Sequence, residues 1–303
     1  MDHVDEAIVE QLETDGRLSH LAIAERVGIS RVAVATRLQR LVASGQVEVR
    51  GVVHPAVLQR GTVAYFRLAV DGPAAPVAAE LAARDDMPLV SLVTGSYDLV
   101  AEVRTASAAR VDEVAGTLRA LPRVRTAEVL SYVEVLRDVV GPTGEVGHTL
   151  DDTDIALLAA LQDDGRASYV DLAAGVGLSP AGARRRVLRL LEGNVVRVGV
   201  VVRQTGRDPM LGLGVRLTGP HEPVVEALLA RPAVLFAART LGAFDLLLTL
   251  RAHAADHLAE LLDAIRALPG VHDVESWSHL HVVKESYAST EVIARRSSTD
   301  GTT

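Results

Sequence analysis

The sequence predicts an α+β protein in which two winged helix-turn-helix domains alternate with two ferredoxin-like βαββαβ domains. Three observations predict this fold class: a long internal repeat, a helix-turn-helix pattern at the start of each repeat, and a change of apolar period in the rest of each repeat. Nearly half of the 303 residues are apolar, but only 3% are aromatic. We therefore expect cores built from Val, Leu, Ile and Ala.

The repeat is visible as identical residues at a constant spacing. Residues 5–41 and 154–190 align at an offset of 149, with fourteen of 37 positions identical. Further along, residues 95–98 and 242–245 share a Gly and an Asp at an offset of 147. A nearly constant register over this length indicates a duplicated two-domain unit, because the period is too long for a solenoid.

Composition marks where the copies join and where the chain loses its pattern. Gly and Pro residues predict a linker between the copies, and the Ser- and Thr-rich end predicts a disordered tail. The expected boundaries are helix-turn-helix domains at 1–54 and 151–203, βαββαβ domains at 60–137 and 208–288, the linker at 138–150 and the tail at 289–303.

The first domain of each copy has the pattern of three short helices. Ser19 and Ser30 are good N-caps for the second and third helices, and Gly28 lies in the turn between them. A short turn between two capped helices is the helix-turn-helix pattern. After the third helix, residues 47–53 and 195–202 each predict a short strand pair, or wing. Copy two repeats the helical pattern with Ser168, Gly177, Ser179 and a helix over residues 180–192.

The third helix of each copy is rich in arginine and has no acidic residue, although the chain has a net charge of −8. A solvated helix face would explain one such helix, but two at equivalent positions favour contact with DNA in the major groove. We expect double-stranded DNA as a partner, with the arginines that recur in both copies contacting phosphates. The expected DNA-binding residues are Ser30, Arg31, Thr36, Arg37, Arg40, Ser179, Arg184, Arg185, Arg186 and Arg189.

The second domain of each copy mixes strand and helix patterns. Their βαββαβ order predicts a ferredoxin-like sandwich with both helices on one face of the sheet. The open face of such a sheet commonly needs a partner, and the second copy supplies one. We therefore expect an intrachain pseudo-dimer. In copy one, strands are expected over residues 62–70, 90–94, 99–103 and 124–135, and helices over 74–83 and 107–121.

Several motifs resemble those of the Lrp/AsnC, or feast/famine, family of transcription regulators. Over nearly its whole length, the chain looks like a tandem fusion of two family units. The resemblance implies a sequence-specific regulator that senses an amino acid or related small metabolite and that can assemble into higher homo-oligomers. The motifs are residues 15–19, 27–30, 37–41, 93–98 and 121–122 in copy one, and 164–168, 176–179, 242–245 and 268–271 in copy two.

The resemblance places the effector near a loop between two strands of each second domain. From the residues alone, Asp98 and Asp245 can also be turn aspartates that cap backbone N–H groups. Copy two replaces three hydroxyl-bearing loop residues with Leu, Ala and Phe, so we expect one polar-ligand site per chain. The expected effector-binding residues are Thr94, Gly95, Ser96, Tyr97, Asp98, Gly242 and Asp245.

An enzyme is the alternative function. Tandem Lrp-like folds also occur in sirohaem decarboxylases, and His54 would then be a candidate residue of a tetrapyrrole site. Two histidine pairs, His253 with His257 and His279 with His281, have spacings that put two imidazoles on one face. No nearby carboxylate or Cys supplies a clear third zinc ligand, so we expect no metal. The arginine-rich third helices and the Gly-x-x-Asp loops fit a regulator better than an enzyme, so we also expect no cofactor and no catalytic residue.

The remaining composition bounds the compartment. The chain has no cysteine, which excludes disulfides and thiolate metal sites. It has no apolar run of the ~20 residues that a membrane span needs, and it does not begin with a signal-peptide pattern. We expect a cytoplasmic protein with no membrane partner.

Overall fold

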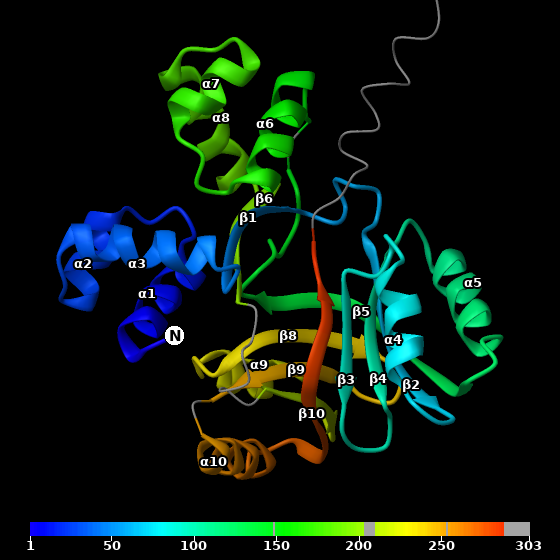
Figure 1. The fold of residues 1–303 in the computed structure, drawn as a ribbon. Helices are drawn as coiled ribbons and strands as arrows, with labels where there is room; N and C mark the ends of the chain where they lie inside the picture. The colour runs from blue at the N-terminus through cyan, green and yellow to red at the C-terminus, as the bar shows by residue number, and fades with distance from the viewer. Residues whose placement is uncertain (148, 203–209, 253, 288–303) are drawn as a thin grey trace, which may run out of the picture. The chain divides into compact units, whose positions relative to one another are not determined.

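The computed structural model describes residues 1–147, 149–202, 210–252 and 254–287, which divide into two compact units (Figure 1). The first unit contains the described residues of 1–58 and 139–205 together with Tyr287, and the second contains those of 59–138 and 206–286. The expected tail at 289–303 lies outside the described residues. No helix in the described ranges is long and apolar enough to cross a membrane.

The first unit contains two three-helix domains with the same order of elements. Ser19 and Ser30 cap their helices as predicted, because each Oγ accepts a hydrogen bond from a backbone N–H three residues on. Gly28 ends the intervening helix with a φ of 76°, a conformation that favours glycine. The elements are α1 (His3–Thr14), α2 (His20–Val27), α3 (Arg31–Ala43) and β1 (Val47–Val53), then α6 (Asp152–Asp163), α7 (Tyr169–Val176), α8 (Pro180–Glu192) and β6 (Val196–Val202).

The prediction of a strand pair within each helix-turn-helix domain is wrong. Each copy contributes one strand, and β1 pairs antiparallel with β6, from Val47 opposite Val202 to Val53 opposite Val196. A hairpin needs a turn between its strands, and each of these seven-residue segments is extended throughout. Each strand therefore satisfies its backbone hydrogen-bonding groups on the strand of the other copy.

Two arginines form reciprocal contacts between the three-helix domains. Arg17 donates two hydrogen bonds, 2.6 and 2.8 Å long, to the backbone oxygens of Gly165 and Ala167. Its counterpart Arg166 donates to the equivalent two carbonyls of copy one, at 2.7 and 2.9 Å. Burial and the positive charge of Arg17 lower the pKa of Arg166. Four charge-assisted hydrogen bonds thus reinforce the pairing of β1 with β6.

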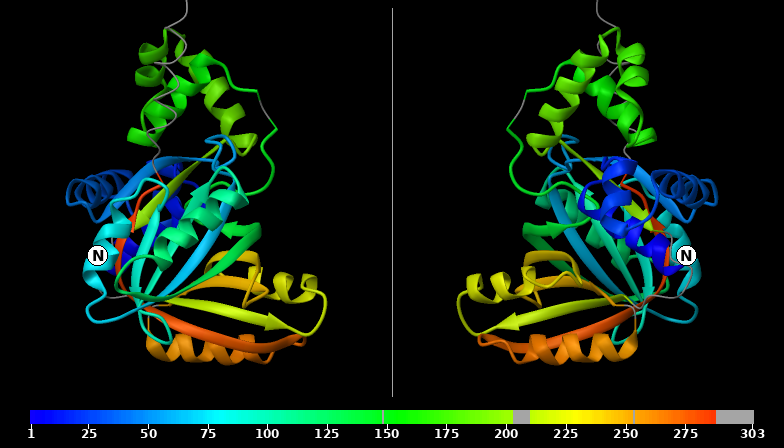
Figure 2. Two further views of the ribbon diagram at one scale, coloured as in Figure 1. Left: turned by 90° about the vertical axis from the view of Figure 1, so that its right-hand side faces the viewer. Right: turned by 90° about the vertical axis from the view of Figure 1, so that its left-hand side faces the viewer.

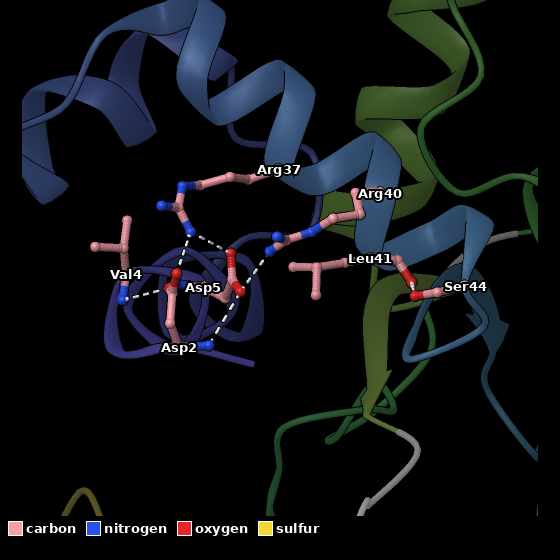
Figure 3. Close-up of polar contacts among 7 residues, drawn as sticks. All are labelled: Asp2, Val4, Asp5, Arg37, Arg40, Leu41 and Ser44. Carbon is pink, nitrogen blue, oxygen red and sulfur yellow. Dashed lines mark hydrogen bonds and ion pairs between the residues drawn. The ribbon is translucent and has the colours of Figure 1, made fainter.

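Ion pairs hold the third helix of each domain against the first. In copy one, Arg37 Nη1 lies 2.6 Å from an Asp2 oxygen and 2.8 Å from an Asp5 oxygen, and Arg40 Nη2 lies 2.6 Å from Asp5 (Figure 3). The Asp5 side chain is only 2% exposed, and it forms a capping box with Asp2 at the start of α1. The arginines of α3 therefore neutralise the carboxylates that begin α1.

Copy two has the same contacts. Arg186 Nη1 lies 2.7 Å from Asp151 and 2.9 Å from Asp154, and Arg189 Nη2 lies 2.7 Å from Asp154. The Asp154 side chain is 1% exposed and also takes part in a capping box. Removing one partner of such a pair would leave a charge buried without compensation, which is costly.

The second unit consists of two four-stranded sheets, each with the element order βαββαβ. Figure 1 labels the copy-one helices α4 and α5 beside strands β2 to β4, and the left view of Figure 2 shows α5 across those strands. The elements are β2 (Thr62–Val70), α4 (Ala75–Ala82), β3 (Leu89–Val93), β4 (Leu99–Thr105), α5 (Ala108–Arg119) and β5 (Val124–Asp138), then β7 (Met210–Leu217), α9 (Glu222–Leu229), β8 (Val234–Leu241), β9 (Leu246–Arg251), α10 (Ala255–Arg266) and β10 (Val271–Glu285).

Two long strands join the sheets into a closed barrel. The first half of β5 pairs with β2 and its second half with β8 of the other copy. In the same way, β10 pairs first with β7 and then with β3. The strand order is β10-β3-β4-β2-β5-β8-β9-β7. Each copy buries an aliphatic core between its sheet and helices, and a third core of residues from both copies fills the barrel.

The acid sensitivity of the first domain tests the ion pairs of α3. The hydrogen bond from Arg37 is the main reason that the pKa of Asp2 falls to about 2. Because this value lies below the ordinary value near 4, the stabilisation by this carboxylate is complete above about pH 5 and is lost as the pH falls towards 2. Arg37→Met should therefore lower the urea midpoint most above pH 5, and its difference from the wild type should shrink towards pH 2.

Arg110→Met is the matched control, because Arg110 forms an exposed ion pair with Glu113 on the surface of α5. A difference between Arg37→Met and the wild type that stays constant from pH 6 to pH 2 would contradict the assigned pairing.

Candidate DNA interface and effector site

The two candidate recognition helices begin with serine N-caps. Ser30 Oγ accepts a hydrogen bond from Ala33 N–H, and Ser179 Oγ accepts one from Gly182 N–H, each at 3.1 Å. Both serines are exposed. A hydroxyl that accepts at an N-cap keeps its own proton to donate, so each serine can still donate to a phosphate.

The four arginines expected to contact phosphates are the ones that pair with the acids of α1 and α6. Arg37 and Arg186 are about 30% exposed and hold two carboxylates each. The sequence itself indicates these ion pairs, because the acidic partners recur at the same offset as the arginines. These arginines connect the third helix to the first helix within each domain.

A second set of cations on the same helices has no such partners. Arg31, Arg184 and Arg185 are exposed and form no salt bridge or side-chain hydrogen bond in the part of the chain that the structure describes. Thr36, the counterpart of Arg185, is also exposed, and Val32 on the same helix is 74% exposed. The available face is therefore mixed in α3 and strongly cationic in α8.

Local positive charge also affects a histidine near this surface. Burial, followed by the positive charges of Arg166 and Arg31, lowers the pKa of His20. The start of α2 therefore lies in a cationic environment, although the chain as a whole is acidic. Such an environment attracts phosphates.

Three of the expected effector residues have structural tasks in the loop between β3 and β4. Thr94 Oγ1 accepts a hydrogen bond from Ser278 N–H at 2.9 Å, which ties the loop to β10. Asp98 accepts one from Val70 N–H at 2.8 Å, as expected of a turn aspartate. Gly95 has a φ of 105°, which favours glycine. The hydroxyls of Ser96 and Tyr97 remain available to a ligand. Ser96 is exposed, and the centroid of the Tyr97 ring lies 4.2 Å from the Arg67 guanidinium carbon.

The corresponding loop of copy two is filled by its own aromatic ring. Asp245 accepts a hydrogen bond from Leu217 N–H at 2.7 Å, so it caps the turn as Asp98 does. Phe244 is 2% exposed and lies 4.7 Å from the guanidinium carbons of both Arg67 and Arg216. Gly242 keeps a positive φ of 139°. This loop presents no side-chain hydroxyl.

The described histidines of the two predicted pairs lie in different surroundings. His279 donates or accepts at Ser91 Oγ at 3.0 Å, and burial lowers its pKa to about 4. His281 is exposed, and a register shift in β10 lies between the two, so the imidazoles do not share one environment. In the described residues, no three His, Asp or Glu side chains group as metal ligands. His253 lies outside the described residues, and His54 Nε2 is 3.0 Å from the Gly144 oxygen.

Comparisons with known proteins identify both kinds of domain. The family model for the AsnC-type helix-turn-helix domain matches residues 1–42 and again residues 150–191. The family model for the Lrp/AsnC ligand binding domain matches residues 213–289.

Regulators from other organisms are similar to about half of the chain. The proline dehydrogenase transcriptional activator of Rhizobium radiobacter is 28% identical over 144 residues, which cover 46% of this chain and 92% of the activator. The HTH-type transcriptional regulator FL11 of Pyrococcus furiosus is 27% identical over 135 residues, which cover 43% of this chain and 89% of FL11. Less than half of this chain thus spans nearly all of each relative.

A solved structure extends the similarity to the whole fold. The siroheme decarboxylase NirDL superimposes with a TM-score of 0.60 over 98% of this chain and 100% of its own, at 14% sequence identity. At this identity the likeness shows the fold alone. The chain thus contains AsnC-type helix-turn-helix domains and an Lrp/AsnC ligand binding domain, and transcription regulators are similar to about half of its length.

Proposed function

We propose that the chain is a fusion of two Lrp/AsnC units and acts as a sequence-specific transcription regulator, in which one polypeptide presents two recognition helices to double-stranded DNA. The observation that carries the proposal is the second match of the helix-turn-helix family model, at the same offset as the internal repeat. The relatives support it, because each corresponds to about one half of this chain.

The first unit has the connections that such a regulator needs. Operators with two half-sites are read by two recognition helices at a fixed separation. Here β1 pairs with β6, and Arg17 and Arg166 each bind backbone oxygens of the other domain. One chain therefore does the task that a homodimer performs in single-unit regulators, and further association of chains is compatible with it.

We assign the arginines of the recognition helices to two roles. Arg31, Arg184 and Arg185 have exposed guanidinium groups that are available to phosphates and guanine edges. Arg37 and Arg186 position the helices through their carboxylate partners. The second role revises the direct phosphate contact that the sequence predicts for these two residues.

DNA binding separates the two roles. Arg31→Ala, Arg184→Ala and Arg185→Ala should each weaken binding about three- to tenfold and lower the salt slope by about one, with the melting temperature unchanged. Arg37→Ala and Arg186→Ala should lower the melting temperature, because each leaves a buried carboxylate short of a partner. The measurements are fluorescence anisotropy with DNA from upstream of the gene at several salt concentrations, and thermal unfolding.

Arg125→Ala is the control, since Arg125 forms an exposed ion pair with Asp71 in the second unit. Wild-type affinity in the combined Arg31, Arg184 and Arg185 variant would show that this face does not contact DNA.

The loop between β3 and β4 of copy one is the proposed site of the effector, an amino acid or a related small metabolite. Ser96 and Tyr97 offer free hydroxyls in copy one, whereas copy two has Ala243 and the buried Phe244 in their places. A ligand with an ammonium and a carboxylate group needs polar partners when it is buried. We therefore assign one polar effector site to each chain, on the side of the copy-one loop.

A thermal-shift screen of amino acids and related metabolites identifies the effector, because a ligand of the folded state raises the melting temperature. Calorimetry with that compound should give about one site per chain, and Ser96→Ala combined with Tyr97→Phe should weaken binding about tenfold or more. Ala243→Ser is the matched change in copy two and should have no effect. Two equal sites, or full affinity in the double variant, would refute the assignment.

The fold similarity to NirDL keeps a tetrapyrrole enzyme as the second candidate. A visible-absorption titration with an iron tetrapyrrole separates the two functions: a shifted absorption band together with no DNA binding would favour the enzyme. Retained DNA binding without a shifted band would favour the regulator, which we place in the cytoplasm with the DNA.

A further inference from the structure

One buried arginine occupies the centre of the barrel. The Arg67 side chain is 4% exposed, with Nε 2.6 Å from a Glu128 oxygen and Nη1 2.8 Å from a Glu275 oxygen. Aromatic rings surround its guanidinium, with centroids 4.2 Å away for Tyr97 and 4.7 Å away for Phe244. Burial disfavours the charged form of Arg67, but the two glutamates outweigh burial and raise its pKa above the ordinary value.

The surrounding groups come in equivalent pairs from the two copies. Glu128 and Glu275 are counterparts at the offset of 147, and so are Tyr97 and Phe244. The strand pairing agrees, because Arg67 lies opposite Glu128 in the sheet of copy one and Gly214 lies opposite Glu275 in the sheet of copy two. A single guanidinium is therefore enclosed by two related carboxylates and two related rings, and its own counterpart is a glycine.

The neighbouring inward-facing position also has a large side chain in copy one and a glycine in copy two. Tyr65 is buried in the barrel, and its counterpart is Gly212. A Cβ on Gly212 would lie 2.1 Å from the indole nitrogen of Trp277, and a Cβ on Gly214 would lie 2.3 Å from the Phe244 ring. Trp277 itself replaces Leu130, the equivalent residue of copy one. Copy two thus fills the space over its two glycines with its own large rings.

We propose that these positions make the two sheets complementary, so that each fits the unlike sheet and not a second copy of itself. Copy one projects Tyr65 and Arg67, and copy two receives them beside Trp277 and Phe244. Pairing copy one with itself would bring two arginines and two tyrosines into a space that holds one of each. Pairing copy two with itself would leave two Glu275 carboxylates, each about 31% exposed, without the Arg67 guanidinium, which is costly for charges partly removed from water.

The partner selected by this surface is therefore the other half of the same chain, or the unlike half of a second molecule. Covalent linkage raises the effective concentration of the former. Duplication followed by divergence at these positions excludes assemblies in which like sensor sheets of two chains pair. The inference concerns the barrel and does not depend on DNA binding.

Three full-length variants test the proposal by exchanging the four pairs of counterparts. The first gives copy two the residues of copy one (Gly212→Tyr, Gly214→Arg, Phe244→Tyr and Trp277→Leu). The second gives copy one the residues of copy two (Tyr65→Gly, Arg67→Gly, Tyr97→Phe and Leu130→Trp). The third carries all eight changes and restores complementarity with the roles reversed.

The expected order of stability does not follow the number of changes: the wild type is most stable, the eight-residue variant comes next, and the four-residue variants are least stable. Each four-residue variant should melt about 10 °C or more below the wild type or fail to fold, whereas the eight-residue variant should recover at least half of that loss. In the eight-residue variant, the tryptophan introduced by Leu130→Trp should also show the emission maximum of Trp277 in the wild type. The loss of melting temperature caused by Arg67→Gly, compared with the loss caused by Arg125→Gly, measures the stabilisation by a buried arginine against that by an exposed one.

An eight-residue variant that is no more stable than both four-residue variants, or that does not fold, overturns the proposal. So does a four-residue variant that melts with the wild type, because like sheets would then pair as well as unlike ones.

Discussion

The pairing of β1 with β6 is the constraint on which the rest of the first unit depends. A lone seven-residue strand exposes unpaired backbone N–H and C=O groups on both edges. Each copy has one such strand, so neither helix-turn-helix domain can complete its own sheet. Val198 and Val200 of β6 accordingly contribute to the core of the copy-one domain, and Val53 of β1 contributes to the core of the copy-two domain. Arg17 and Arg166 reinforce this exchange from the helical side.

Much of this architecture could be predicted from local sequence signals. Capping serines and the positive-φ glycines mark helix ends through interactions with near neighbours in the chain, and the structure has them at Ser19, Gly28 and Ser30. The element order of the second domains followed from apolar period in the same way. These predictions succeeded because each depends on a few consecutive residues.

The features that the sequence analysis missed depend on contacts across the repeat or between helices. The prediction of a wing was wrong because β1 pairs with β6, which lies 149 residues further along the chain. The carboxylate partners of Arg37 and Arg186 were also missed, since those acids lie at the start of other helices. Periodicity and charge counts do not show which cations are already paired. The acids that recur in register with the arginines were the available signal.

The internal repeat shows which features the two halves share and where they differ. The capping residues, the paired acids and arginines and the turn aspartates recur in both copies, because they maintain each domain. The copies differ where they meet in the barrel, for example at Arg67 and Gly214 and at Tyr97 and Phe244. A homodimer cannot have such differences, since each substitution would appear on both sides of its axis. Fusion removes that restriction.

We propose that one chain holds two recognition helices at a fixed separation. The most direct test measures affinity and stoichiometry on DNA in which the distance between two selected half-sites is varied one base pair at a time. We predict one chain per pair of half-sites, and at least tenfold weaker binding when the spacer changes by about 5 bp, because that turns one half-site to the opposite side of the duplex. Arg17→Ala with Arg166→Ala should flatten this dependence. Affinity that is independent of spacing in the wild type, or one chain bound at each half-site, would contradict the claim.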